Sequence, residues 1–154
     1  MIEIYADKEL EIYFSETPHI DVRYLLPWQD KKEQENIIKF PFENKKEFKV
    51  YIVDIETMED YTLTVEKGYC WDGATIPRFL WSLIGSKTDN SFLIPSCIHD
   101  ILCNNHDLVC GDRNLSSRVF KALLLASGVS KFKAQTMYLA VDNFQRLCGW
   151  HENK

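Results

Sequence analysis

The sequence predicts an α+β fold, with an antiparallel N-terminal sheet packed against a C-terminal bundle of about four helices. Apolar and polar residues alternate with a period of two in the first half, which is typical of half-buried strands. Apolar residues recur at helical spacing in the second half. The composition changes between residues 68 and 77 without a linker, and 154 residues is an ordinary length for one domain. We therefore expect residues 1–154 to form a single α+β domain.

The N-terminal half supplies the predicted strands. Residues 3–5 and 10–14 are short strand candidates bounded by polar turns. Residues 48–55 are dense in Phe, Val, Tyr and Ile, and residues 61–66 alternate apolar and polar side chains. The polar residues between these last two runs predict a hairpin whose second strand has one buried side and one solvent-facing side.

Residues 28–36 interrupt this pattern, because they are charged and contain almost no apolar side chains. They predict an exposed loop or a frayed helical turn. Trp28, at the start of this stretch, and Trp150 both lie beside polar segments, which makes them candidates for a contact surface. The other aromatic residues of the second half are expected in the core.

The C-terminal half supplies the predicted helices. A short helix is expected over residues 77–83, with Pro77 at its first position, where the missing N–H costs nothing. A second helix is expected to begin near Pro95 and to run through His99 to about residue 104.

The last two helices have recognisable ends. The third is expected over about residues 115–126, with Asp112 or Asn114 as its cap and a glycine after its end. The fourth follows the cap residue Ser130, carries an apolar stripe at helical spacing and stops at Gly149.

Charge and composition argue against several classes of protein. The net charge of −5 and the pI of about 5.4 argue against binding to a nucleic-acid backbone, which needs a basic face. No apolar run approaches the roughly 18–20 residues that span a bilayer, and the N-terminus lacks the basic and apolar regions of a signal peptide. Five cysteines without a secretory signal predict reduced thiols. We expect a protein that stays in the cytoplasm of the producing cell or is packaged in a virus particle.

The first block that could carry chemistry spans residues 68–78, at the predicted junction of strand and helix. Gly73 permits a sharp turn or a close approach of the backbone to a ligand. Asp72, just before it, can cap that turn or direct its carboxylate at a divalent cation. Both roles stay open, although Asp-Gly is first of all a turn signal.

The second block is the pair His99 and Asp100, inside an otherwise apolar helical stretch. Adjacent helical positions lie about 100° apart, so the two side chains cannot both point into the core, but both can flank a cleft. A neutral His can act as a general base or a ligand, and an Asp can bind a hard cation or accept a proton. The alternative is a structural role, with each side chain hydrogen-bonded to a neighbouring element.

Together the two blocks resemble the domain of unknown function 1353 family of bacteriophages and bacteria. The resemblance rests on G-Y-x-x-D-G-A-T-I-P-R-F-L-W, then H-D-x-L, then a Phe-bearing helix ending in Gly-Val, then A-x-x-M-Y-x-A-V. It covers roughly residues 61–146. The resemblance implies a phage or prophage source, and hence the cytoplasm of a bacterial cell or a phage virion as the location. It implies no assigned activity.

The helical blocks also resemble secreted phospholipase A-two enzymes, which carry His-Asp on one helix and a calcium-binding loop. By that resemblance His99 would activate a water molecule. Asp100 would bind calcium or another divalent cation together with backbone carbonyls of the loop at Asp72 and Gly73. Cys103 stands where these enzymes usually have an aromatic residue.

A second departure from those enzymes concerns the residue that orients the His. Ser117 stands where they have an Asp, and a serine is a poor substitute for a carboxylate that must stabilise an imidazolium. Either another acid, such as Asp112 or Asp142, takes over this role, or the site is degenerate.

Two other metal sites fit parts of the sequence. His99, Cys103, His106 and Cys110 have the spacing H-x3-C-x2-H-x3-C and could chelate zinc if the chain folds back after the helix. The His-Asp pair could also belong to a metal-dependent phosphohydrolase of the HD type, with Asp142 as the later ligand. That class needs an earlier helical His, and the sequence offers one only in a β-like region.

The leading hypothesis is a phage-type accessory hydrolase, with His99 as general base and with Asp72 and Asp100 holding a divalent cation or positioning the His. The alternative is a non-catalytic phage protein that acts by binding a host or phage protein, as a virion component or as an inhibitor of a host defence system. Under either hypothesis we expect Asp72 within about 8 Å of His99 or Asp100, because burying polar groups singly costs about 1–3 kcal/mol each.

Overall fold

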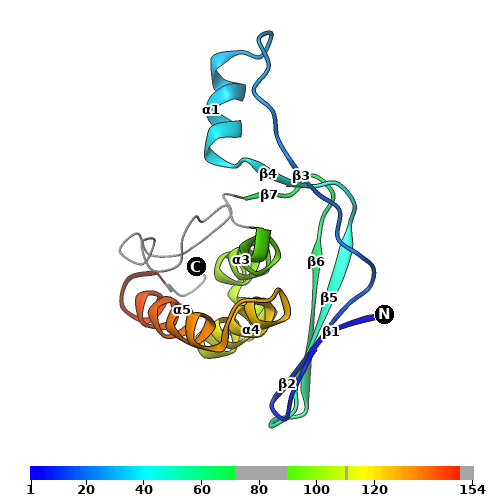
Figure 1. Cartoon of the computed structure of the whole chain (residues 1–154), viewed down its shortest axis with the longest axis vertical. Helices are drawn as coiled ribbons and strands as arrows, with labels where there is room; N and C mark the ends of the chain where they lie inside the picture. Colours follow the sequence, from blue (N-terminus) through cyan, green and yellow to red (C-terminus); the bar gives the residue numbers. More distant parts are fainter. Residues whose placement is uncertain (72–89, 110, 150–154) are drawn as a thin grey trace.

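The computed structural model describes residues 1–71, 90–109 and 111–149, and the structural statements below concern these residues. The strands are β1 (Ile2–Ala6), β2 (Leu10–Phe14), β3 (Ile20–Val22), β4 (Phe42–Asn44), β5 (Phe48–Asp54), β6 (Glu59–Val65) and β7 (Cys70–Trp71). The helical elements are α1 (Lys31–Lys39), α3 (Asn90–Asn104), the 3-10 turn η2 (His106–Val109), α4 (Arg113–Ala126), α5 (Lys131–Phe144) and the π-helical turn η3 (Gln145–Gly149). The fold is α+β, as predicted (Figure 1).

The main sheet is antiparallel and has the strand order β1-β2-β5-β6. In the hairpin of β5 and β6, Phe48 pairs with Val65 and Val50 pairs with Leu63. These four side chains are buried, whereas Thr64, between two of them, is exposed. The predicted hairpin, with one buried side and one solvent-facing side, is confirmed.

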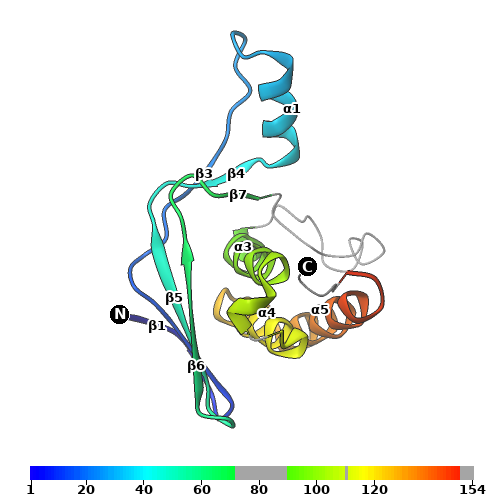
Figure 2. The ribbon, with the colours of Figure 1, turned by 180° about the vertical axis from the view of Figure 1, so that it is seen from behind.

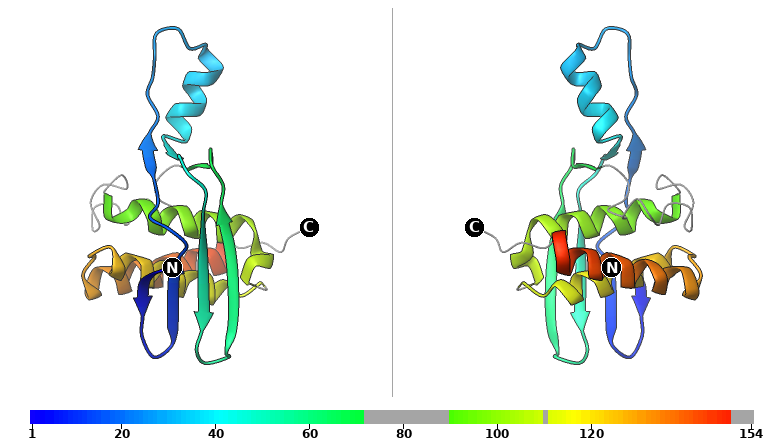
Figure 3. Two further views of the ribbon diagram at one scale, coloured as in Figure 1. Left: turned by 90° about the vertical axis from the view of Figure 1, so that its right-hand side faces the viewer. Right: turned by 90° about the vertical axis from the view of Figure 1, so that its left-hand side faces the viewer.

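Helices α3, α4 and α5 lie on one face of this sheet and cross its strands (Figure 2, Figure 3). Helix α4 belongs to two apolar clusters at once. Its side chains in the cluster shared with the sheet and α3 are Leu115, Val119, Ala122 and Leu123. Its side chains in the cluster shared with α5 and Phe92 of α3 are Phe120 and Leu124. Helix α4 therefore occupies the centre of the molecule.

The prediction for residues 28–36 is wrong, because α1 is a nine-residue helix that covers most of this stretch. The Asp30 carboxylate caps it by accepting a hydrogen bond from the backbone N–H of Glu33 at 2.8 Å. Ile37 is only 7% exposed and anchors the helix on its apolar side. The cap and the burial of Ile37 both favour a helix in this charged segment.

Helix α3 begins earlier than predicted, at Asn90 rather than near Pro95, so that Pro95 lies inside it. An internal proline removes one backbone hydrogen bond. The first turns of α3 nevertheless bury Phe92, which is 2% exposed, in the cluster with α4 and α5. We attribute the early start to this packing, which offsets the lost hydrogen bond.

The predicted caps of the later helices are confirmed. Asp112 accepts a hydrogen bond from the backbone N–H of Leu115 at 3.0 Å, and Ser130 accepts one from Lys133 at 3.3 Å. The helix predicted over residues 77–83 lies outside the described residues. None of the described helices is long and apolar enough to cross a membrane.

A smaller sheet, of order β3-β4-β7, carries a projecting arm that we define as residues 20–44. Helix α1 stands away from the body of the molecule at the end of this arm (Figure 1, Figure 3). Several large apolar side chains on the arm are exposed, namely Tyr24, Leu25, Trp28 and Ile38.

Asn44 joins the two sheets. Its side-chain amide donates to the carbonyl oxygen of Val65 at 3.1 Å and to that of Glu66 at 3.0 Å. Its backbone carbonyl accepts from Gly68, and its backbone N–H donates to Tyr69, each at 2.8 Å. Gly68 has a φ of +91°, a conformation that favours glycine. Asn44, which is fully buried, thus sets the path of the chain after β6 and the position of Tyr69.

Replacing Asn44 with Ala should lower the free energy of unfolding by about 1–3 kcal/mol, because buried carbonyl groups lose their donor. Urea unfolding followed by circular dichroism measures this change. Asn143→Ala, at an exposed helical position, is the matched control and should shift stability by no more than about 0.5 kcal/mol. Equal losses in the two variants would contradict the role of Asn44 as the junction.

Candidate functional site

The two sequence blocks meet at a hydrogen bond between Tyr69 and Asp100. The Tyr69 hydroxyl, just before β7, donates to the Asp100 carboxylate on α3. The Tyr69 ring stacks on Trp71, with 6.0 Å between the centroids and 21° between the planes. Trp71 is itself 1% exposed. This bond ties the strand end of the first block to the helix of the second.

His99 points into the core. It is 1% exposed, and its ring lies against Phe120 of α4 with 4.9 Å between the centroids. Its Nε2 lies 3.5 Å from the Sγ atom of Cys103, one turn later on α3. Burial lowers the pKa of His99 from 6.5 to about 4, so the imidazole is neutral at pH 7. Asp100, the next residue on α3, stays partly exposed.

The thiols on α3 are protonated at neutral pH. Burial, with a smaller contribution from the Asp100 charge, raises the pKa of Cys103 to about 12, and the Ser116 hydroxyl opposes this rise. Burial also raises the pKa of Cys97, which is fully buried, well above its usual value. Since the thiolate is the nucleophilic and metal-binding form, neither thiol is activated here.

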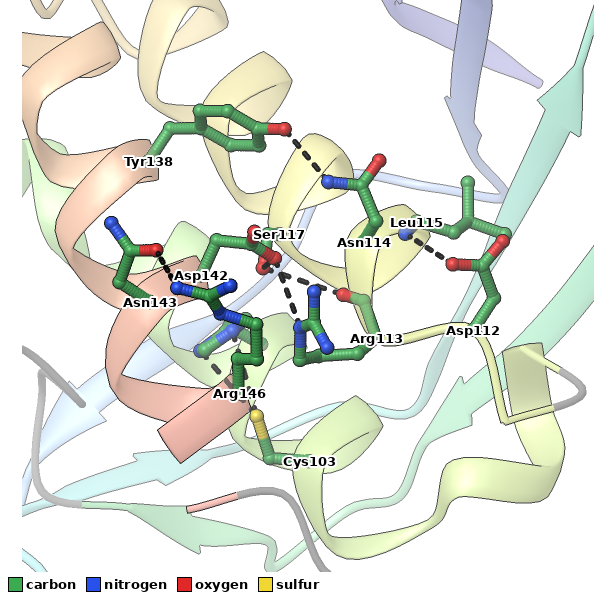
Figure 4. A network of polar contacts seen from close by, with 11 residues as sticks. Cys103, Asp112, Arg113, Asn114, Leu115, Ser117, Tyr138, Asp142, Asn143 and Arg146 are labelled. Carbon is green, nitrogen blue, oxygen red and sulfur yellow. Dashed lines mark hydrogen bonds and ion pairs between the residues drawn. The ribbon is translucent and has the colours of Figure 1, made fainter. Parts of the chain in front are cut away.

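A second set of interacting polar side chains lies on the side of α4 that faces α5. The Ser117 hydroxyl donates to Oδ1 of Asp142 at 2.9 Å, and Nε of Arg113 lies 3.3 Å from the same oxygen (Figure 4). Ser117 precedes Phe120 by three residues, so both share the face of α4 that contacts His99. Of the two acids considered for the missing carboxylate, Asp142 therefore reaches this face, whereas Asp112 caps α4.

Several predicted ligands lie outside the described residues. They include Asp72 and Gly73, so the predicted distance from Asp72 to the His-Asp pair stays a prediction. The proposed calcium loop also depends on these two residues, and the zinc hypothesis includes Cys110. Among the side chains that the structure describes, no group of three or more His, Cys, Asp or Glu residues is placed to hold a metal ion.

Sequence reasoning named His99 and Asp100 but missed the partners that hold them. Tyr69 was part of the first block, and no pattern indicated that its hydroxyl would reach Asp100. For Ser117, the sequence left Asp112 and Asp142 open as the replacing acid, and the Ser117 hydroxyl binds Asp142 of α5. In both cases the partner is distant in the sequence, where local spacing carries no signal.

The buried His99 makes stability depend on pH. In the unfolded chain the imidazole takes up a proton as the pH falls through 6.5, whereas in the folded chain it resists protonation down to a pKa of about 4. Acidification from pH 6.5 to 4 should therefore lower the free energy of unfolding by about 3 kcal/mol through His99 alone. A change of pH above 7 should not alter stability through His99. Urea unfolding at a series of pH values measures this loss.

The variant His99→Gln isolates that contribution. Glutamine is a polar side chain of similar size that does not take up a proton in this pH range. The stability of the variant should therefore fall less steeply between pH 6.5 and 4 than that of the wild type. The exposed His19→Gln is the matched control and should follow the wild-type slope. Parallel curves for wild type and His99→Gln would show that His99 is not buried as a neutral group.

Comparison with known proteins confirms the resemblance. The profile of the family described as "Protein of unknown function (DUF1353)" matches residues 49–141. The uncharacterized protein y4jT of Sinorhizobium fredii is 32% identical over 97 residues, which cover 58% of this chain and 28% of that protein. The uncharacterized protein y4iH of the same organism is 36% identical over 73 residues, or 47% of this chain and 29% of that protein.

The chain thus spans less than a third of the length of either curated relative. No solved structure matches it. Because the family profile covers more than half of the residues, including α3, α4 and most of α5, the chain belongs to the DUF1353 family of proteins of unknown function.

Proposed function

We propose that this chain is a phage-type accessory protein that acts by binding another protein through its arm. The observation that carries the proposal is the exposure of large apolar side chains on an element that stands off the body. Trp28 is 80% exposed, Ile38 67% and Tyr24 66%. Exposed aromatic side chains of this size often serve as anchors in protein interfaces.

The charges around these side chains favour a protein as the partner. Helix α1 carries three basic residues and two acidic residues, namely Lys31, Lys32, Lys39, Glu33 and Glu35. A helix that lies on a membrane surface usually carries a basic polar face, and a nucleic-acid site needs a basic stripe. A mixed polar rim around exposed apolar anchors is instead typical of protein interfaces.

The arm also lies outside the segment that matches the family profile, residues 49–141. Most of the body, including β6, α3 and α4 with His99 and Asp100, lies inside that segment, whereas β1 and β2 precede it. We infer that the body supplies a scaffold shared with the family and that the arm selects a partner particular to this chain, either a host protein or a phage protein.

The state of the His-Asp centre supports binding over catalysis. His99 is almost fully buried and neutral, Cys103 is a protonated thiol, and the Asp100 carboxylate accepts the Tyr69 hydroxyl. A general base works best when its pKa lies near the operating pH and when it can reach the substrate. These groups have the properties of a structural centre that holds β7, α3 and α4 together.

Serine substitutions on the arm test this proposal. Three proteins are each used to capture proteins from the producing bacterium. They are the wild type, the arm variant Tyr24→Ser/Trp28→Ser/Ile38→Ser and the control Met58→Ser/Phe132→Ser, which also replaces exposed apolar side chains. Quantitative mass spectrometry should show a protein that wild type and control retain and that the arm variant loses at least about tenfold, because anchor residues dominate binding. Identical captured sets for all three proteins, with folding verified by circular dichroism, would contradict the proposal.

The hydrolase predicted from the sequence is the second candidate, and the bond from Ser117 to Asp142 favours it. That bond brings a carboxylate to the α4 face that contacts the His99 ring. A neutral imidazole can accept a proton from water, and a nearby carboxylate would stabilise the resulting imidazolium. Asp100, with Asp72, would position His99 or hold a divalent cation.

Hydrolysis of p-nitrophenyl acyl esters tests the second candidate. His99→Gln and Asp142→Asn should each lower the rate at least about 100-fold, while the exposed Asp107→Asn should leave it unchanged. The wild-type rate should fall only as the pH drops through about 4, because the neutral imidazole is the active form. A rate that is the same for all four proteins would exclude His99 as a general base for these esters.

A further inference from the structure

We propose that a pocket between the main sheet and helices α4 and α5 binds the oxyanion group, a carboxylate or a phosphate, of a small molecule. The pocket has a volume of about 390 Å³, which is within the range of small-molecule sites. Its sheet side comes from the β1–β2 hairpin and from Glu56 in the turn between β5 and β6. Neither His99 nor the arm contributes to it.

The helices contribute the hydrogen-bond donors of the pocket. Asn114, Arg118 and Lys121 lie three or four residues apart on α4, so they share one face of that helix. Gln135 and Tyr138 reach the same pocket from α5. These side chains are partly buried, so the positive charges of Arg118 and Lys121 act where water screens them less than at the open surface.

These donors are only partly used within the described part of the protein. Nη1 of Arg118 lies 3.5 Å from Oδ2 of Asp54, which is longer than a good hydrogen bond, and its Nη2 is buried without a hydrogen-bond partner among the described residues. Nζ of Lys121 lies 5.4 Å from the centroid of the Tyr138 ring, and no described carboxylate forms an ion pair with it. The Arg118 guanidinium and the Lys121 ammonium can thus donate further hydrogen bonds to a ligand.

Tyr138 adds a neutral donor. Its hydroxyl oxygen accepts a hydrogen bond from the side-chain amide of Asn114 at 2.8 Å. The proton of that hydroxyl is therefore free to point toward a ligand. A guanidinium, an ammonium and a hydroxyl that line one cavity are the donor set that recognises a carboxylate or a phosphate.

Three acidic residues also line the pocket, and the first of them, Asp7, is occupied by hydrogen bonds. Asp7 already accepts hydrogen bonds from the Tyr5 hydroxyl at 2.5 Å and from the backbone N–H groups of Glu9 and Leu10 at 2.7 and 2.8 Å. Burial raises the pKa of Asp7, but these hydrogen bonds and the Arg118 charge lower it overall. Asp7 is thus held within the hairpin and feels the positive charge across the pocket.

The other two acids, Glu9 and Glu56, are exposed, so solvent and salt screen their charge. They would repel a ligand with several negative charges more than one with a single anionic group. We therefore assign the pocket to a small molecule with one oxyanion head.

The test is a titration of the full chain with sodium acetate and, separately, with sodium phosphate, at constant ionic strength and followed by two-dimensional NMR. We expect saturable shifts confined to residues that line the pocket. Lys121→Gln and Arg118→Gln should each weaken binding at least about tenfold, since each removes a charge-assisted hydrogen bond. The matched control Lys131→Gln, at the exposed start of α5, should bind like the wild type.

Each outcome decides the proposal. Saturation by acetate identifies a carboxylate site, and saturation by phosphate identifies a phosphoryl site. Absence of saturation with both anions, or equal binding by wild type and Lys121→Gln, overturns the proposal. If Arg118→Gln fails to fold because Asp54 loses its partner, Lys121→Gln alone decides. The double variant Glu9→Gln/Glu56→Gln should bind the same anion a few-fold more tightly, because it removes two negative charges that repel the anion.

Discussion

The burial of helix α4 on two sides is the constraint on which the rest of the structure depends. One side contributes Leu115, Val119 and Leu123 to the cluster with the sheet, and another contributes Phe120 and Leu124 to the cluster with α5. Burial of apolar surface is the dominant favourable term in folding. Because α4 joins both clusters, it sets the position of α5 relative to the sheet.

Three of the polar centres contact α4. Phe120 supports the His99 ring, Ser117 holds the Asp142 carboxylate, and Arg118 and Lys121 line the oxyanion pocket. The polar residues of α4 therefore lie at the borders of its two apolar faces, where neighbouring elements supply partners for them. A shift of α4 would disturb all three centres together.

The protein divides into a body and a projecting arm (Figure 1). In the body, the Tyr69 hydroxyl pairs with the Asp100 carboxylate across two elements. On the arm, large apolar groups such as Trp28 remain exposed. The Asn44 junction lies between the two parts, since β4 belongs to the small sheet and its side chain holds the end of β6.

The sequence by itself determined the elements whose signals are local. The hairpin of β5 and β6 follows from alternation with a period of two, and the starts of α4 and α5 follow from the caps Asp112 and Ser130. Helix α1 also had a local signal, the cap Asp30, although the charges around it predict an exposed loop or a frayed helical turn. The early start of α3 had no such signal, because it depends on the burial of Phe92 between α4 and α5.

Only the tertiary structure decided which residues share a site. His99 and Asp100 were recognisable as a polar pair in an apolar helix, yet their environment depends on Tyr69 and Phe120, which are distant in the sequence. The pocket at Arg118 likewise combines a hairpin, a turn and two helices. The physical reason is that spacing along the chain encodes the face of one element, whereas burial, pKa and donor geometry arise where several elements pack together.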